Sequence, residues 1–521
     1  MLFAGLDVST QSCKLLVIDT LLEEVVFSTQ INYDNDLPEY ETLNGVIQGL
    51  PHGVSESDPL MWIAAVEKVF TRLAKSDIPQ NTIKSISVSG QQHGLVAINS
   101  KGGLSHPTSK LWNDFSTQKE CDNLTEAVGG EAEMIAEIGN SQRTGYTASK
   151  ILHLKRNFKD NYNKISIFLL VHNYINFYLT GGIVVMEPGD VSGMALSHPE
   201  KAIWSEKVIN AIDSNLLKKL PPVKASHRSI GKISEPLAIK FGFDKECKID
   251  AGSGDNMYGA IGTGNIEEGI VTISLGTSGT AYTFMKDAFV DHTGEISLFC
   301  DSTGNYMPLL CVSNLANGYN QIIEQYGLSH NDFNLLLHKT EAGNKGKMLI
   351  PWFEGERTPD VPLATPTYFG FGLSDFNKEN LGRAVVEGAV LNLYNGFKRM
   401  PIKATEIRLT GGLSKSPVWR QIIADIFNVE VVPVNGEGAA LGAAIHAAWV
   451  WNKENGTNLS IKKISAPFIS LNEKERAKPI AENVKVYSVQ KKLFSVLSDN
   501  LRANNSGDVF ELRRDLINKI V

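Results

Sequence analysis

The chain has 521 residues, which is too long for one ordinary hydrophobic core, so we expect at least two lobes. Its net charge of −7 without a long basic run argues against a nucleic-acid partner, and its sequence has no apolar run as long as a membrane span. The five cysteines lie far apart with no C-x-x-C pair, which favours free thiols in a reducing compartment. The first residues, "MLFAGLDVST", lack the basic region of a signal peptide, so the expected location is the cytoplasm.

Short apolar runs open the chain. Residues 3–8, 13–19 and 24–33 predict three antiparallel strands joined by tight turns. Residues 57–76 predict a helix, because Pro59 suits a first turn and apolar residues recur at helical spacing at Leu60, Ile63, Val66, Phe70 and Leu73. Residues 82–94 then predict a strand that ends in the loop "SGQQHG". Strands that alternate with helices indicate an α/β layered fold.

A similar pattern returns in the second half. Residues 269–284 predict strand, turn and strand, and residues 404–427 predict a strand, a diglycine turn and a helix that Ser416 caps. The small apolar stretch 436–451 suits a helix packed closely against a neighbour. The repetition indicates a duplicated fold whose halves join just after residue 263, with a cleft between them.

Familiar nucleotide-binding motifs are missing from the sequence. Neither the P-loop pattern nor the G-x-G-x-x-G of a dinucleotide-binding unit is present. Instead, residues 7–12 and 275–280 form turns rich in glycine and hydroxyl groups, whose backbone N–H groups are able to surround phosphate oxygens. Either turn alone is equally typical of an ordinary β-hairpin.

One carboxylate stands out in "DAGSGDNMYGA", residues 250–260. Asp255 follows a strand-like stretch and lies between small residues. It is either a turn residue or a proton acceptor to which small neighbours give a substrate access.

Six motifs together carry a family resemblance. They are "GLDVSTQSCK" (5–14), "SGQQHG" (89–94), "GSGDN" (252–256), "SLGTSG" (274–279), "PWFEGERTP" (351–359) and "LTGGLSKSPVWRQIIAD" (409–425). The chain resembles the FGGY carbohydrate kinases over nearly its whole length, and within them most closely those that act on D-xylulose. The resemblance implies two ribonuclease-H-like, actin-type ATPase lobes: residues 1–263 for the sugar, residues 264–483 for the nucleotide, and a segment 484–521 that returns to the first lobe. One departure is His153, a packing position where the family has Trp.

The resemblance also implies roles on the sugar side. Asp255 is expected to be the general base and, with Asn256, to bind the sugar. Gln92 and His93 are expected to contact sugar hydroxyls, and this pair, in place of the charged Arg-Glu pair of glycerol kinase, favours a neutral ketose. Residues 110–117 add Trp112, either an aromatic wall of the sugar pocket or plain core, and Asp114, a candidate hydroxyl acceptor.

Phosphoryl transfer depends mainly on positioning and charge neutralisation. Asp7, at the end of the first strand, is expected to contact Mg²⁺ through water, although it also suits a turn cap. The Thr10 hydroxyl is a candidate hydrogen-bond donor to a phosphate oxygen. We expect Gly276, Thr277 and Ser278 to hold phosphates, and Gly411 and Gly412 to let the adenosine approach the backbone. The charged loop residues Glu354, Glu356 and Arg357 lie either at the cleft or, as we expect for each, on a solvated face.

The predicted activity is phosphorylation of D-xylulose to D-xylulose 5-phosphate with ATP and Mg²⁺. One alternative is a family kinase for ribulose, gluconate or glycerol. An alternative of another class is a non-catalytic, actin-like module that nucleotide opens and closes. The expected partners are a small sugar and ATP, with no nucleic acid and no membrane, and the sequence leaves a homodimer open.

Overall fold

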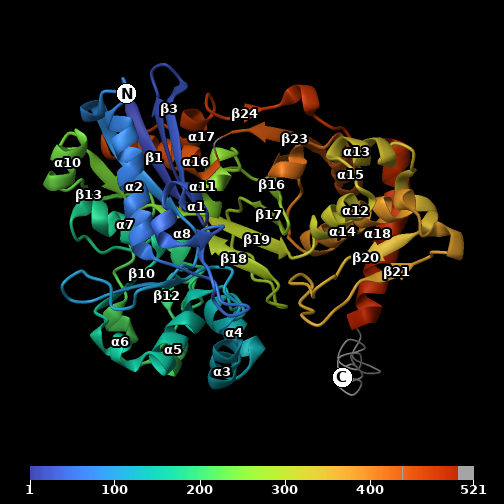
Figure 1. Cartoon of the computed structure of the whole chain (residues 1–521), viewed down its shortest axis with the longest axis horizontal. Coiled ribbons are helices and arrows are strands. Elements are labelled where there is room, and N and C mark those ends of the chain that lie inside the picture. The colour runs from blue at the N-terminus through green and yellow to red at the C-terminus, as the bar shows by residue number, and fades with distance from the viewer. Residues whose placement is uncertain (437, 503–521) are drawn as a thin grey trace.

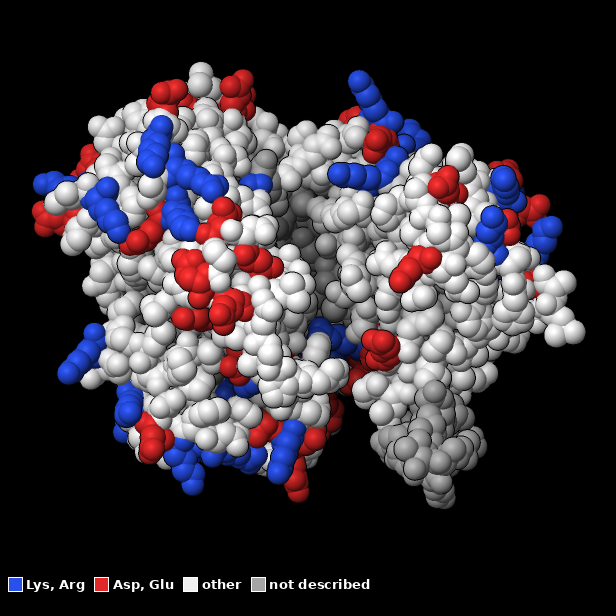
Figure 2. All heavy atoms as spheres, in the orientation of Figure 1, with Lys and Arg blue, Asp and Glu red and all other residues white. Residues whose placement is uncertain are grey.

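The computed structural model describes residues 1–436 and 438–502. It contains two seven-stranded sheets. Figure 1 places them in two halves side by side, with the blue-to-green first part of the chain in one half and most of the yellow-to-red part in the other. Figure 2 shows a groove between these halves. The expected α/β architecture of two lobes is confirmed.

The first sheet begins with the three predicted antiparallel strands. β1 pairs antiparallel with β2, and β2 pairs antiparallel with β3. On its other side β1 pairs parallel with β7, which also pairs parallel with β14. The strands are β1 (Leu2–Val8), β2 (Ser12–Asp19), β3 (Glu24–Asn32), β7 (Ile83–Gly90), β13 (Ser229–Lys232), β14 (Lys248–Asp250) and the short β15 (Ser253–Gly254).

The second sheet repeats this order. β19, β17 and β16 are antiparallel neighbours, and β16 continues in parallel to β22 and β23. The turn 276–278 is therefore the counterpart of the turn 9–11, and the loop after β22 is the counterpart of the loop after β7. The strands are β16 (Ile270–Leu275), β17 (Gly279–Thr283), β18 (Ile296–Cys300), β19 (Tyr306–Val312), β22 (Glu406–Thr410), β23 (Glu430–Asn435) and β24 (Ser470–Leu471).

Helices cover the outer faces of both sheets. On the first sheet, α2 has Pro59 in its first turn, as predicted, behind the cap Asp58. Leu60 is 50% exposed, however, because the buried stripe instead includes Trp62 and Val69. On the second sheet, α15 begins at Pro417 behind the predicted cap Ser416. The outer helices are α2 (Pro59–Ala74), α7 (Val171–Thr180) and α10 (Glu235–Phe241) on the first sheet, and α12 (Asn317–Tyr326), α14 (Lys378–Phe397) and α15 (Pro417–Phe427) on the second.

Two helices pack between the lobes. α11 (Asp255–Gly262) and α16 (Gly438–Glu454) contact each other, and α16 also lies against β1, β2 and β7 of the first sheet. A Cβ on Gly442 would lie 1.8 Å from the Tyr258 carbonyl oxygen, and a Cβ on Gly262 would lie 2.1 Å from the Gly438 carbonyl oxygen. The predicted close packing of this small apolar helix is confirmed, since any side chain at these glycines would push the helices apart.

The C-terminal helix α18 (Ala481–Arg502) corrects one prediction. It packs against α14 and α15, and Tyr487 and Phe494 are buried in the core of the second lobe. The Tyr487 hydroxyl donates to Glu387 over 2.7 Å, which ties the helix to α14. The described part of the segment 484–521 therefore does not return to the first lobe, and α16 makes that crossing instead. Residues 503–521 lie outside the described residues.

A smaller group of helices extends the first lobe toward the second. It is built on the core of Met134, Ile151, Phe168 and Leu196 and reaches Phe299 on β18. No helix in the described ranges is long and apolar enough to cross a membrane. The helices of this group are α3 (Gln118–Val128), α4 (Glu131–Ile138), α5 (Thr147–Asn157), α6 (Lys159–Lys164), α8 (Pro188–Val191) and α9 (Glu206–Ile212).

Candidate active site

Three parallel strands of the first sheet end at one edge and bring the predicted residues together. Asp7 on β1 and Ser253 on β15 both lie opposite Ser89, on either side of β7. Because neighbouring strands lie about 4.8 Å apart, the chain positions following these strands converge. The same edge of the sheet therefore carries Asp7, the loop 91–93 and Asp255.

Asp255 is the first residue of α11 and is only partly exposed. Its Oδ1 accepts hydrogen bonds from the backbone N–H of Asn256 over 2.8 Å and from Asn256 Nδ2 over 3.3 Å. Burial raises the pKa of Asp255 to about 8, and the charges of Asp7 and Asp190 act in the same direction. A carboxylate with a pKa near the working pH is suited to accept a proton.

Asp7 is the second acid at this edge. Its Oδ1 accepts a hydrogen bond from the Ser89 hydroxyl over 2.8 Å. Burial raises the pKa of Asp7 to about 6, against the opposing effects of Ser89 and Lys14. Two carboxylates at one sheet edge form a donor set that suits Mg²⁺, which prefers oxygen ligands and often takes one or two carboxylates beside substrate phosphates.

A buried acid that sequence reasoning missed holds the Asp255 loop in place. Glu187, the N-cap of α8, is fully buried and accepts hydrogen bonds from the hydroxyls of Ser226 and Ser253. Ser253 lies two residues before Asp255. The acid that anchors this loop is 66 residues away in sequence, so no local pattern indicates the contact.

The loop after β7 carries buried donors with no partner. Asn256 Nδ2 donates to Gln92 Oε1 over 2.6 Å, so the two predicted sugar residues contact each other directly. Among the described residues, Gln91 Nε2, Gln92 Nε2 and His93 Nδ1 have no hydrogen-bond partner. Buried polar groups are nearly always satisfied, so this set of unpaired groups indicates a place where a polar ligand binds.

His93 is held in an aromatic setting. Its ring lies 5.0 Å from that of Tyr146 and 5.7 Å from that of Phe299 on β18, measured between centroids. A Cβ on Gly193 would lie 2.0 Å from His93 Cε1, so only glycine leaves room for the ring. Burial, with the positive charges of Lys150 and Arg357, holds the pKa of His93 well below its usual value. The ring is therefore neutral and presents one donor and one acceptor.

Thr10 and Trp112 belong to the same side of the site. Trp112 Nε1 donates to Thr10 Oγ1 over 2.9 Å, and Thr10 Oγ1 donates to Gln91 Oε1 over 3.3 Å. The structure thus connects Thr10 with the predicted sugar residue Trp112 and with Gln91, and the contact of Thr10 with phosphate stays a prediction.

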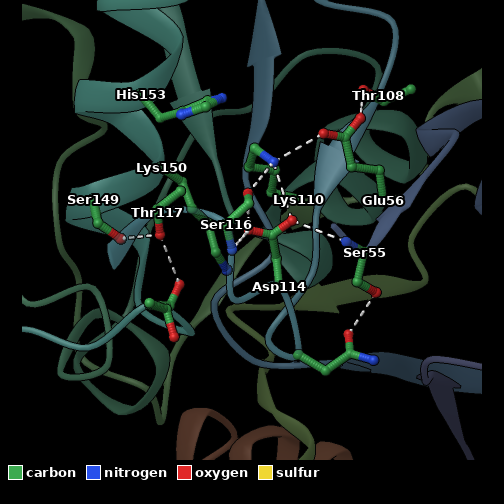
Figure 3. Close-up of polar contacts among 12 residues, drawn as sticks. Ser55, Glu56, Thr108, Lys110, Asp114, Ser116, Thr117, Ser149, Lys150 and His153 are labelled. Carbon is green, nitrogen blue, oxygen red and sulfur yellow. Dashed lines mark hydrogen bonds and ion pairs between the residues drawn. The ribbon is translucent and has the colours of Figure 1, made fainter. Parts of the chain in front are cut away.

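Asp114 differs from its expected role. Its side chain is fully buried and paired with Lys110 Nζ over 3.0 Å. It also accepts hydrogen bonds from the backbone N–H of Ser55 and from the Ser116 hydroxyl. Figure 3 shows these contacts inside a polar cluster that also contains Glu56. With its oxygens occupied in this way, Asp114 is a structural ion-pair partner and not a hydroxyl acceptor for the sugar.

The residues predicted to bind phosphate lie in the turn of the second sheet that is equivalent to the turn 9–11 of the first. Gly276 and Thr277 are exposed in the turn between β16 and β17, with Ser278 partly exposed beside them. Ser274 on β16 lies opposite Thr410 on β22. The turn 276–278 and the diglycine loop therefore lie at the same edge of the second sheet.

The two glycines of that loop differ. Gly411 has a φ of +84°, and a Cβ there would lie 2.5 Å from the Leu275 carbonyl oxygen. A Cβ on Gly412 would meet no atom within 4 Å. Gly411 is therefore required by the backbone, whereas Gly412 leaves open space beside the loop.

The charged loop of the second lobe is not the solvated face that was expected. Glu354 is exposed, but Glu356 is buried because donors from distant segments converge on it, including the backbone N–H of Ser313 and Asn392 Nδ2. Arg357 is partly buried, and its guanidinium lies 5.2 Å from the Phe115 ring centroid of the first lobe. This loop therefore reaches across the groove to the segment 110–117 of the first lobe.

Comparison with known proteins agrees with this geometry. The domain described as "FGGY family of carbohydrate kinases, N-terminal domain" matches residues 2–262, and the corresponding C-terminal domain matches residues 271–451. The chain belongs to the FGGY family of carbohydrate kinases. It is accordingly an enzyme that transfers a phosphoryl group from ATP to a sugar, and its family resemblance is confirmed.

Several relatives of this FGGY kinase carry the same name. A protein named xylulose kinase from Haemophilus influenzae is 35% identical over 497 residues, which cover 93% of this chain and 97% of the relative. Another of that name from Mus musculus is 28% identical over 508 residues, covering 90% of this chain and 89% of its own.

Solved structures agree on the fold but do not separate the sugars. The structure described as ligand-bound xylulose kinase from Lactobacillus acidophilus has a TM-score of 0.85 at 23% identity, covering 96% of this chain and 99% of that chain. A gluconate kinase from the same organism also has a TM-score of 0.85, at 23% identity, with 96% and 98% covered. The choice of sugar by this FGGY kinase must therefore be argued from its site.

Proposed function

We propose that this kinase phosphorylates D-xylulose to D-xylulose 5-phosphate, with Asp255 as the general base. The relatives named xylulose kinase support this substrate. The observation that carries the proposal is the pairing of two features at one sheet edge: a carboxylate with a raised pKa, and the unpaired buried donors of the loop 91–93.

Apart from the two acids at its edge, the groups proposed to contact the sugar are uncharged, and the positive charges of Lys150 and Arg357 lie close enough to lower the pKa of His93. Gln91, Gln92, neutral His93 and Asn256 supply donors and acceptors for hydroxyl and carbonyl oxygens. A carboxylate substrate such as gluconate would face Asp7, whose pKa of about 6 leaves it mostly charged near neutral pH, so like charges would oppose its binding. A site that hydrogen-bonds a substrate group strongly rejects analogues without that group, because buried polar atoms are left unpaired.

Proton transfer needs one acceptor close to the attacking hydroxyl. Asp255 would take this proton through Oδ2, because Oδ1 is held by Asn256. The Trp112 indole would close one side of the sugar pocket, with its N–H retained by Thr10.

The nucleotide would lie against the second sheet. Gly276, Thr277 and Ser278 would hold its phosphates, and the open space beside Gly412 would admit the adenosine. Mg²⁺ bound near Asp7 through water would neutralise charge on the phosphate oxygens. Five free thiols agree with a reaction in the cytoplasm.

A substrate panel tests the proposal. kcat/KM is measured by ADP release with D-xylulose, D-ribulose, D-gluconate, glycerol and xylitol at saturating ATP and Mg²⁺. D-xylulose should have the highest value, and xylitol, which lacks the carbonyl, should have a lower one. If gluconate or glycerol were the best substrate, the D-xylulose assignment would be wrong while the family assignment would stand.

A further inference from the structure

The backbone of His93 has an unusual conformation for its residue type. Its φ is +65°, in the left-handed region that residues with a Cβ seldom adopt. Such conformations persist only where the surroundings hold them, and they cluster at functional sites. The predicted sugar contact of His93 therefore depends on whatever holds this peptide in place.

Two groups from α5 hold the His93 carbonyl oxygen. Lys150 Nζ donates to it over 2.8 Å, and the Thr147 hydroxyl donates to it over 3.4 Å. Lys150 Nζ also donates to the Gly145 carbonyl oxygen over 2.7 Å. A Cβ on Gly145 would lie 2.6 Å from the Trp112 carbonyl oxygen, so this second carbonyl belongs to a segment that contacts the Trp112 backbone. One amine thus ties together two walls of the sugar site.

Lys150 differs from its neighbour Lys110. Lys110 pairs with Glu56 and Asp114, each over 3.0 Å, as the dashed lines in Figure 3 show. Lys150 enters the same cluster from α5 and is buried, with 1% of its surface exposed, but it has no carboxylate within salt-bridge distance among the described residues. Burying a charged amine without a counter-ion is unfavourable, so ion pairing does not explain the buried position of Lys150.

The chemistry of the amine agrees with its two contacts. Burial lowers the pKa of Lys150 to about 7. The neutral amine has two N–H donors, and the structure supplies two carbonyl acceptors for them. The protonated form would leave its third donor without a partner among the described residues.

We propose that Lys150 is a positioning residue for sugar binding, which acts by holding the left-handed His93 peptide against the Gly145 segment. This inference rests on the proposed function, because it takes His93 as a sugar contact. Lys150 itself does not touch the sugar. Its loss should let the His93 loop relax, so that the ring no longer meets the sugar hydroxyls while the nucleotide side stays intact.

The test compares Lys150→Met with the matched control Lys110→Met. Lys150→Met should raise KM for D-xylulose about 10-fold, the usual effect of leaving a buried acceptor unpaired, with KM for ATP unchanged within about twofold. Lys110→Met should lower the thermal midpoint because it strands two carboxylates, with KM for D-xylulose unchanged within about twofold.

A double-mutant cycle separates positioning from general damage. In a His93→Ala background, Lys150→Met should add less than about a twofold further rise in KM for D-xylulose, because the residue it positions is already gone. An equal rise in both backgrounds, or an equal rise in KM for ATP, would overturn the proposal. A wild-type enzyme without D-xylulose activity would instead contradict the proposed function.

A second variant tests the proposal if the Lys150→Met protein does not fold. If Lys150→Met fails to fold, Thr147→Val removes the other donor to the same carbonyl and should raise KM for D-xylulose about threefold. A Thr147→Val enzyme with an unchanged KM for D-xylulose would then overturn the proposal.

Discussion

The loop that leaves β7 and the loop that leaves β22 occupy the same place in two sheets of the same strand order. The first presents Gln91, Gln92 and His93, all buried and each with an unpaired polar atom. The second presents Gly411 and Gly412, both exposed and without side chains. One copy of the duplicated fold thus offers side-chain groups at this position, and the other offers backbone.

This difference agrees with what each ligand requires. A small sugar presents hydroxyls in a pattern that only placed side chains are able to distinguish. A nucleotide is larger, and glycines let it approach the main chain closely while backbone N–H groups meet its phosphates. In the proposed function, the duplication supplies two equivalent edges, and the residues on each edge would decide which ligand it binds.

The largest expected effect concerns Asp255, the acid beside the side-chain loop. Asp255→Asn keeps the size and removes the proton acceptor, so kcat should fall by roughly two to four orders of magnitude. Binding of D-xylulose, followed by calorimetry, should change much less. Near-normal turnover of this variant would make Asp255 a turn residue.

The next effect concerns Asp7, the second acid at the edge of the first sheet. Asp7→Ala should raise the Mg²⁺ concentration for half-maximal activity by about 10- to 100-fold, as expected for a carboxylate that acts on the metal through water. A Mg²⁺ titration at fixed ATP and D-xylulose measures this. An unchanged titration midpoint would mean that Asp7 serves only as the partner of Ser89.

His93→Ala probes the side-chain loop alone. Loss of its hydrogen bond should lower kcat/KM for D-xylulose roughly 10-fold or more, with KM for ATP unchanged. Steady-state kinetics with each substrate varied in turn provide the measurement. Equal losses for sugar and ATP would remove the proposed division between the two edges.

Gly411→Ala and Gly412→Ala probe the backbone loop as a matched pair. Gly411→Ala strains a left-handed residue and clashes with Leu275, so it should lower the thermal midpoint and raise KM for ATP about fivefold. Gly412→Ala meets open space and should keep the thermal midpoint, and it should raise KM for ATP only because the adenosine needs that space. Neither should change KM for D-xylulose, and a change there would contradict the backbone role.

The smallest effect is on stability and follows from the pKa of Asp255. Its folded pKa of about 8 lies above its ordinary value of 3.8, so its protonated form favours the folded state. The stability that it contributes is therefore full below about pH 4 and is lost as the pH rises toward 8. Asp255→Asn should melt about 2 °C or more above the wild type at pH 8.5 and by a smaller margin at pH 5. The same margin at both pH values would argue against a raised pKa.

Much of the fold could be predicted because short stretches of the sequence determine where its strands and helices begin and end. Alternating apolar runs mark the strands, and Ser416 followed by Pro417 marks a helix start. The strand order of the two sheets follows from the duplication. The boundaries of buried faces were harder, as Leu60 shows, because helical spacing alone does not say which face meets the sheet.

Contacts between distant segments could not be predicted. Trp112 donates to Thr10 across 102 positions, and Glu356 is buried by donors from residues 313, 314 and 392. The direction of α18 also depends on distant partners, since its buried Tyr487 suits any apolar surface until Glu387 and Arg383 bind its hydroxyl. The same limit hid Glu187 and Lys150, whose contacts with Ser253 and with the His93 carbonyl oxygen span 66 and 57 positions.

The most direct test of the account is whether ADP release and sugar phosphorylation are coupled. The chain is incubated with ATP and Mg²⁺, with or without D-xylulose, and ADP and pentulose phosphate are quantified together by mass spectrometry. The account predicts that ADP release depends on the sugar, that the two products form in equal amounts, and that Asp255→Asn forms neither at a comparable rate. Equal ADP release with and without sugar, and no pentulose phosphate, would contradict it and favour an actin-like ATPase.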